Sequence, residues 1–93
     1  MIVCSCEIEI LIYESNSLKE KRQVVKSIIE RIRSKFNASI AEVGYNEMWN
    51  RSLLGLAVVS NNNRLCDASI SKIISFIDND ERVEIINCRR EMV

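Results

Sequence analysis

The sequence predicts an α+β domain, in which a four-stranded antiparallel sheet carries two helices on one face and the elements follow the order βαββαβ. Three observations lead to this fold class. Residues 2–13 alternate between apolar and polar side chains, as in a half-buried strand. Two later segments place apolar residues at helical spacing. A chain of 93 residues can build one core, so we expect a single domain over residues 1–93.

The first strand and the first helix are marked by their side-chain patterns. The even positions of residues 2–12 hold only Ile and Cys, whereas Ser and Glu occupy several odd positions. Ser17 and Glu20 fit a capping box, in which the Ser17 hydroxyl accepts from the Glu20 amide and the Glu20 carboxylate reaches back to Ser17. A helix should therefore begin at Leu18. Its apolar arc, which we expect to face the sheet, comprises Leu18, Val25, Ile28, Ile29, Ile32 and Phe36.

The remaining elements are a hairpin, a helix and a final strand. Residues 38–45 and 52–60 are β-branched and aliphatic runs on either side of a polar stretch, which predicts a hairpin. Residues 61–63 are asparagines that can cap a second helix, whose apolar positions are Cys66, Ile70, Ile73 and Ile77. Residues 82–92 make the last strand. Two right-handed crossovers in this order place both helices on one face of the sheet, which is the ferredoxin-like arrangement.

The composition excludes several classes of function. No apolar run approaches the ~20 residues that cross a bilayer, and the first residues lead into alternation rather than a cleavable leader. We therefore expect a cytoplasmic protein without a membrane partner. The chain has no histidine, which excludes serine–histidine catalysis, and it has no glycine-rich phosphate loop. We expect no cofactor and no enzymatic activity.

The four cysteines are predicted to be reduced thiols. Cys4 and Cys6 point to the inner side of the first strand, Cys66 lies on the buried arc of the second helix, and Cys88 lies in the last strand. Metal binding is the alternative, but there is no CxxC pair and no histidine, and same-face strand positions lie too far apart for easy chelation. We therefore expect apolar thiols in the core and no metal site.

Positive charge is concentrated in the first helix. Residues 19–35 contain seven of the thirteen Lys and Arg residues and only two acids, although the whole chain is neutral. Four of these side chains lie within about 60° of the helical wheel, and we call them the basic row: Lys19, Arg22, Lys26 and Arg33. The row indicates contact with a phosphate backbone, or else a solvated face that only aids solubility. Lys21 points toward the apolar side, where its stem should cover Leu18 or Val25.

The uncovered face of the sheet is predicted to be unusually apolar. If the hairpin is symmetric about Trp49 and Asn50, Gly44 lies opposite Gly55 and the two glycines cut a notch in that face. A second copy or a partner protein can cover the residues expected there, which are Ile40, Gly44, Leu53, Gly55, Ala57 and Val59. Carboxylates beside the notch can act as acid and base or hold a metal, although exposed Glu is ordinary on an open sheet: Glu7, Glu9 and Glu42.

Trp49 lies in the hairpin loop beside Asn50 and Arg51. An indole next to a guanidinium can stack on an RNA base or anchor a protein partner, and packing across the end of the sheet is the alternative. A protein that reads RNA on its sheet face needs aromatic residues on the two middle strands, here the first and third, which carry only Tyr13. If RNA is bound, the first helix and the loops are the better candidates.

Four strings of the sequence resemble those of one protein family. They are residues 16–22 (Asn-Ser-Leu-Lys-Glu-Lys-Arg), 41–44 (Ala-Glu-Val-Gly), 48–51 (Met-Trp-Asn-Arg) and 54–61 (Leu-Gly-Leu-Ala-Val-Val-Ser-Asn). Together with the length, they resemble the YlxP-like family of small bacterial proteins of unknown function, over essentially the whole chain. The resemblance implies a ferredoxin-like fold, a cytoplasmic protein and a gene placed near translation and ribosome-maturation genes. It implies no active site, and the cysteines are particular to this chain.

The leading hypothesis is a non-enzymatic domain that binds ribosomal RNA or ribosomal particles through the basic row, aided by Trp49 and Arg51. We predict phosphate contacts rather than sequence readout, and no DNA partner. The first alternative is a homodimeric interaction or regulatory module that uses the open sheet face. The second is a small-ligand module or an acylphosphatase-type enzyme, which rests on the shared fold alone.

Overall fold

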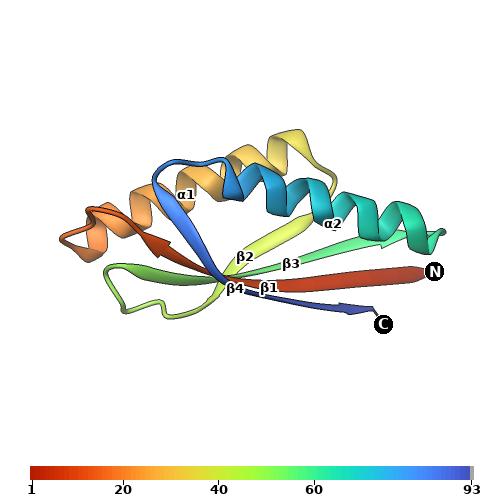
Figure 1. Ribbon diagram of the computed structural model, residues 1–93, viewed down its shortest axis with the longest axis horizontal. Coiled ribbons are helices and arrows are strands. Elements are labelled where there is room, and N and C mark those ends of the chain that lie inside the picture. The colour runs from red at the N-terminus through yellow and green to blue at the C-terminus, as the bar shows by residue number, and fades with distance from the viewer. Residues whose placement is uncertain (93) are drawn as a thin grey trace.

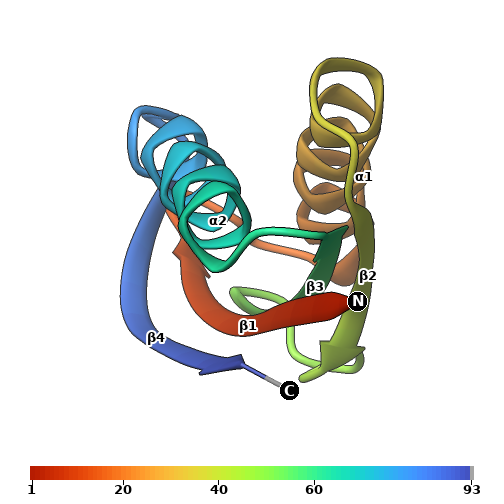
Figure 2. The same ribbon diagram turned by 90° about the vertical axis from the view of Figure 1, so that its right-hand side faces the viewer.

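The computed structural model describes residues 1–92, with side chains described for residues 1–91. Its elements are β1 (Ile2–Ile12), α1 (Leu18–Lys35), β2 (Ser39–Gly44), β3 (Arg51–Ser60), α2 (Asn63–Asp78) and β4 (Val83–Met92). The sheet has the strand order β2-β3-β1-β4, and all neighbouring strands are antiparallel. Both helices cover one face of this sheet (Figure 1, Figure 2). The predicted order of elements and the α+β ferredoxin-like fold are confirmed.

Each helix begins at a polar capping residue that the sequence predicts. The Ser17 hydroxyl accepts from the Glu20 amide at 3.1 Å, as predicted. The Glu20 carboxylate accepts from the backbone amide of Asn16 at 2.8 Å, one residue before the expected partner. The side chain of Asn62 caps α2 by accepting from the amides of Arg64 and Leu65. These caps fix where the two helices start and therefore how they lie along the sheet.

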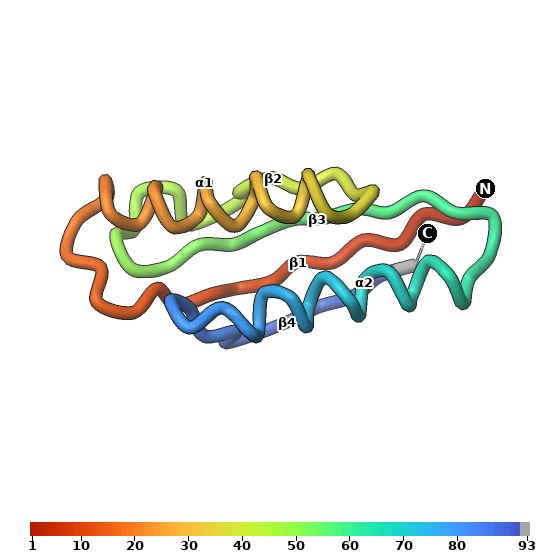
Figure 3. Tube along the Cα trace, turned by 90° about the horizontal axis from the view of Figure 1, so that it is seen from above, coloured from red at the N-terminus to blue at the C-terminus, as the bar shows by residue number. Residues whose placement is uncertain are grey.

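The core lies between the helices and the even positions of β1. Because strand side chains alternate, Ile8 and Ile10 are fully buried, whereas Glu7 and Glu9 face away from the helices. Looking down on the helices, α1 lies over the β2 side of the sheet and α2 over the β4 side (Figure 3). The helices contribute buried side chains at helical spacing, which are Val25, Ile28, Ile32, Cys66, Ile70, Ile73 and Ile77. The prediction that Cys4, Cys6 and Cys66 are buried thiols is confirmed.

The register of the β2–β3 hairpin differs from the prediction. Gly55 pairs with Ala41, and Gly44 pairs with Leu53, so the two glycines do not face one another. A register irregularity between Glu42 and Gly44 adds one residue to β2, which a symmetric hairpin does not include. A Cβ at Gly55 would lie 3.0 Å from Val43, so this glycine accommodates a neighbouring side chain. The predicted notch between two opposed glycines is wrong.

The same irregularity moves two predicted open-face residues to the covered face. Ile40 is buried in the core opposite Leu56, and Glu42 bonds to Lys21 of α1. Alternation in an uninterrupted strand places Ile40, Glu42 and Gly44 on one face, which is the basis of the prediction. The extra residue in β2 breaks this alternation, so that only Gly44 of the three pairs with an open-face residue. The predictions for Ile40 and Glu42 are therefore corrected.

Candidate functional site

The basic row follows one flank of α1, above the edge of the sheet. The apolar arc of the helix packs on the sheet, which turns Arg22, Lys26 and Arg33 toward the edge strand β2. These side chains line a groove of about 350 Å³, whose remaining walls come from both elements: Val25, Ile29, Glu30, Ala41 and Glu42. Lys19 lies one turn earlier on the exposed side of the helix, outside the groove lining. The structure thus brings three of the four predicted residues into one groove.

Most charges of the basic row lack a close acidic partner. The Nζ atom of Lys26 is 4.0 Å from the Oε1 atom of Glu30, and both side chains are well exposed. Among the side chains of residues 1–91, the other three members of the row make no ion pair: Lys19, Arg22 and Arg33. Exposed pairs at this spacing stabilise by only about 0.5 kcal/mol or less. The positive charge of the row is therefore available to an anion.

The arginines of the sheet and its turns behave differently. Each forms an ion pair of 3.0 Å or shorter, and the pairs are Arg51 with Glu9, Arg82 with Asp80, Arg89 with Glu91, and Arg90 with Asp67. Arg51 is consequently neutralised on the open sheet face, away from the basic row. The predicted contribution of Arg51 to RNA contact stays a prediction, and this residue would act from a different face than the row.

Arg33 has a neutral partner instead. Its guanidinium donates to the backbone carbonyl of Ile40 at 2.9 Å. That carbonyl belongs to the edge strand β2, which has a neighbouring strand on one side only. A carbonyl does not cancel the charge of Arg33, but the bond holds the side chain beside the groove.

Lys21 is buried and does not extend along the helix surface to solvent as predicted. None of its side chain is exposed, and its Nζ donates to Glu42 Oε2 at 2.7 Å and to the Tyr45 carbonyl at 3.1 Å. The Ser52 hydroxyl donates to the same carboxylate oxygen at 2.6 Å. The sequence contained two signals for this ion pair. Lys21 is a lone lysine on the apolar side of its helix, and Glu42 is a lone glutamate within an apolar strand. Lys21 thus removes one positive charge from the surface and ties α1 to the hairpin.

The loop between β2 and β3 is held in place at several points. The Ser15 hydroxyl donates to the Trp49 carbonyl at 2.6 Å, and the Ile12 amide donates to the Asn50 carbonyl at 2.8 Å. Tyr45 begins the loop at a φ of 58°, the left-handed region that a tyrosine rarely adopts. Half of the Trp49 surface, 51%, remains exposed. The structure therefore leaves the indole available for contact at the end of the molecule.

The open face of the sheet carries the other predicted residues. Leu53, Gly55, Ala57 and Val59 alternate with buried positions of β3 and face away from the helices. Around Gly55 there is a hollow of about 360 Å³, which side chains of three strands line: Ser5, Glu7, Ala41, Val43 and Ala57. Within the described residues, no group of three or more Cys, Asp and Glu side chains is placed to hold a metal ion.

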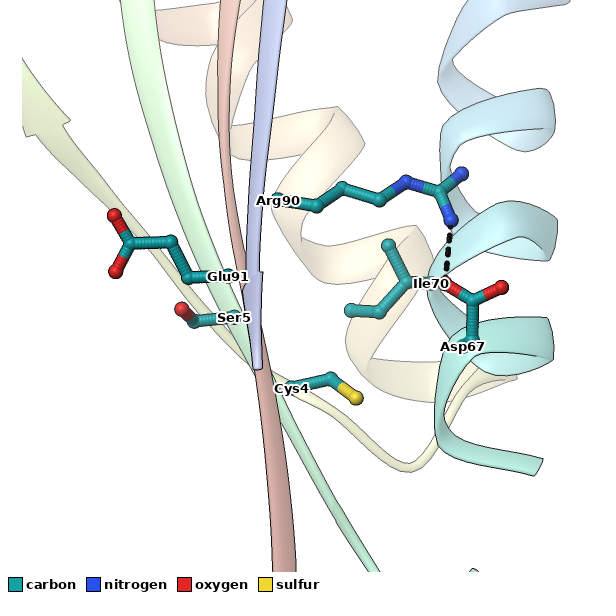
Figure 4. A pocket seen from close by; sticks show the side chains of 6 residues that line it. All are labelled: Cys4, Ser5, Asp67, Ile70, Arg90 and Glu91. Carbon is teal, nitrogen blue, oxygen red and sulfur yellow. Dashed lines mark hydrogen bonds and ion pairs between the residues drawn. The ribbon is translucent and has the colours of Figure 1, made fainter. Parts of the chain in front are cut away.

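A smaller hollow, of about 200 Å³, lies between α2 and the C-terminal end of β4 (Figure 4). Arg90 is its one cation, and Asp67 and Ser71 already accept from it at 2.8 and 3.0 Å. A hydrogen bond with Cys66, and then burial, raise the pKa of Cys4 to about 11, so this thiol stays protonated at neutral pH. The hollow offers neither a free charge nor a thiolate, and the basic groove on α1 remains the better candidate.

The comparisons with known proteins agree on one family. A family model described as "Protein of unknown function (DUF503)" matches residues 3–90 of the chain. The chain belongs to the DUF503 family. This DUF503 protein is also similar to "Uncharacterized protein YlxP" of Bacillus subtilis (strain 168), with 40% identity over 85 residues that cover 91% of this chain and 92% of the relative. The resemblance to a YlxP-like family is thereby confirmed.

Neither description names an activity, a substrate or a partner for this family. In the part of the DUF503 protein that the structure describes, no helix combines the length and the apolar character needed to cross a membrane.

Three of the four strings that resemble the YlxP-like family lie close together in the structure, namely residues 16–22, 41–44 and 48–51. Lys21 belongs to the first, Glu42 to the second and Trp49 to the third, and the contacts of Lys21 and Ser15 join these segments.

Proposed function

We propose that this DUF503 protein is a non-enzymatic binding domain that contacts the phosphate backbone of structured RNA, as in ribosomal particles, through the basic row. The single observation that carries the proposal is the contrast in charge pairing. Arginines of the sheet and its turns are matched with acids at 3.0 Å or less, whereas, among the described side chains, three of the four cations of the row make no ion pair and Lys26 lies 4.0 Å from the exposed Glu30. Unmatched cations on a neutral chain favour an external anion.

The geometry of the row suits a polyanion better than a single small anion. Arg22 and Arg33 are eleven positions apart on α1, about 16 Å along the helix axis. Guanidinium groups bind phosphate oxygens in a bidentate manner, and the lysines act as point charges between them. Such contacts position a protein on an RNA helix without reading its sequence. Trp49, exposed at the end of the molecule, adds a surface on which an unpaired base can stack.

Charge-matched variants test this function. The variant Lys19→Gln, Arg22→Gln, Lys26→Gln and Arg33→Gln should lose co-sedimentation with ribosomal particles. The slope of log affinity against log salt should become shallower by roughly three for a structured RNA, because about 0.7 to 0.9 counterions are released for each phosphate contact.

The matched control removes four exposed basic residues outside the row, with the variant Arg31→Gln, Lys35→Gln, Arg64→Gln and Lys72→Gln. This control variant has the same net charge as the row variant and should keep most of the affinity for RNA. Equal losses in both variants would mean that net charge alone drives binding, and unchanged binding by the row variant would refute the proposal.

Self-association through the open sheet face is a second candidate function. It is favoured by Val59, whose surface is 60% exposed, and by the shallow hollow around Gly55. Light scattering at increasing concentration should show a dimer that Val59→Glu dissociates. The matched control is Leu65→Glu, because Leu65 is 59% exposed on α2 and away from that face. A wild-type protein that stays monomeric throughout would exclude this candidate.

A further inference from the structure

Two thiols from distant parts of the chain come into contact on the sheet. Cys6 lies in β1 and Cys88 in β4, and their Sγ atoms are 3.3 Å apart. In the antiparallel register Cys6 pairs with Arg90 and Cys88 pairs with Ile8, so the two cysteines are diagonal neighbours on the same face of adjacent strands. The contact is thus a consequence of the strand register rather than of a mobile loop.

The two thiols differ in their access to solvent. Cys88 is exposed, whereas Cys6 is only 2% exposed. Cys4 and Cys66 are buried as well, so Cys88 is the one thiol of the four that a dissolved reagent meets directly. An exposed thiol that touches a buried one matches the arrangement of a reactive cysteine with a resolving partner.

The protonation of the buried thiol supports an order of reaction. Burial, and then the hydrogen bond with Cys88, raise the pKa of Cys6 to about 12. Cys6 therefore keeps its proton and can donate it to the sulfur of Cys88. Cys6 is then placed to react second, when its proton can leave with a water molecule.

We propose that Cys6 and Cys88 form an oxidation site for hydrogen peroxide that closes into a disulfide between β1 and β4. In the first step the Cys88 thiol gives up its proton to water and its sulfur attacks one peroxide oxygen; the O–O bond breaks, the departing hydroxide takes up a proton, and Cys88 sulfenic acid and water form. In the second step the Cys6 sulfur attacks the sulfenic sulfur, the S–O bond breaks, and the disulfide and a second water form. Two thiols lose their hydrogens, and one peroxide is reduced to two waters.

The fold allows the closure that this step needs. The sulfurs must approach from 3.3 Å to about 2.0 Å, the length of a disulfide bond. β4 is an edge strand with a neighbouring strand on one side only, and its register with β1 is irregular between Glu9 and Ile10. A small displacement of this edge toward β1 brings the sulfurs together. The bond would join residues 82 positions apart and hold the last strand to the centre of the sheet.

Peptide mapping of the full chain after peroxide treatment tests the site. Cys6 and Cys88 should together lose the mass of two hydrogen atoms, and trypsin should release peptide 83–89 linked to peptide 1–19. Because peptide 1–19 also contains Cys4, the Cys4→Ala variant should give the same linkage. The oxidised protein should melt at a higher temperature than the reduced protein, and a dithiol reductant should reverse the shift.

Two further variants separate the steps. Cys6→Ala should stop at Cys88 sulfenic acid, which a cyclic 1,3-dione traps as an adduct, and Cys88→Ala should show no oxidation of its cysteines under the same treatment. Cys88 is exposed, so its replacement leaves the core intact even if the Cys6 variant fails to fold. Oxidation of wild-type Cys88 to sulfinic acid without a linked peptide, or a link to Cys4 or to a second chain, would overturn the proposal.

Discussion

Lys21 shows how a single buried charge can organise a small domain. Its ammonium group has no contact with solvent and is surrounded by the Glu42 carboxylate and the carbonyls of Tyr45 and Asn46. The Asn46 side chain also approaches Glu42, at 3.4 Å. Such a pair adds little net stability compared with an apolar pair, but removal of one partner leaves the other without compensation. Lys21 therefore fixes the position of the hairpin loop against α1.

We predict that Lys21→Met lowers the free energy of unfolding by about 3 kcal/mol, because Glu42 then stays mostly buried without its cation. The double variant Lys21→Met with Glu42→Gln should recover part of this loss, since the unpaired charge is gone. Urea denaturation measures the free energy of unfolding of both variants. Lys19→Met, at an exposed position two residues earlier, serves as the control and should change stability by no more than about 0.5 kcal/mol. Equal effects at Lys19 and Lys21 would contradict this role.

At the scale of elements, the helices were easier to predict than the hairpin. Ser17 and the asparagines before α2 are local signals, because each cap acts within three residues of itself. The irregularity between Glu42 and Gly44 has no such signal, since it depends on how β2 meets β3 and α1. One extra residue there reversed the predicted faces of Ile40 and Glu42. The basic row was predictable for the same reason as the caps: helical spacing alone determines it.

The turn from α2 to β4 gives a prediction at the same scale. Asp80 accepts from the Arg82 backbone amide at 3.0 Å and from its guanidinium at 2.9 and 2.7 Å, and β4 begins one residue later. These bonds from Arg82 hold the pKa of Asp80 below its ordinary value of 3.8. Because the pKa is lower in the folded state, the stabilisation is present above pH 3.8 and is lost as the pH falls through the folded-state pKa.

Asp80→Asn should therefore be less stable than the wild type at neutral pH, and the difference should shrink as the pH falls below 3.8. Thermal melts of both proteins at a series of acidic pH values measure this difference in stability. The exposed Asp78, at the end of α2, provides the matched variant Asp78→Asn, for which we expect a smaller difference at neutral pH. A difference between wild type and Asp80→Asn that does not change with pH would mean that the carboxylate charge is unimportant there.

At the scale of the whole molecule, the two candidate surfaces are separate. The molecule measures 42 × 21 × 17 Å, and the basic row runs along a helix on one side of the sheet while Val59 lies on the other. Substitutions in one surface should leave the other unchanged, so RNA contact and self-association can be tested independently. The net charge of zero does not reveal this division, because the arginines of the strands are paired with acids, whereas residues 19–35 contain only two acids.

The bond from Arg33 to the Ile40 carbonyl also affects how copies of the chain meet one another. An uncovered strand edge is a template on which a strand of another molecule can add, and growth of this kind leads to aggregates. β2 is six residues long, its pairing is irregular near its end, and Arg33 occupies one of its outward carbonyls. The guanidinium therefore obstructs strand addition at this edge. The same residue that we propose for phosphate contact thereby also protects this strand edge from addition of another chain.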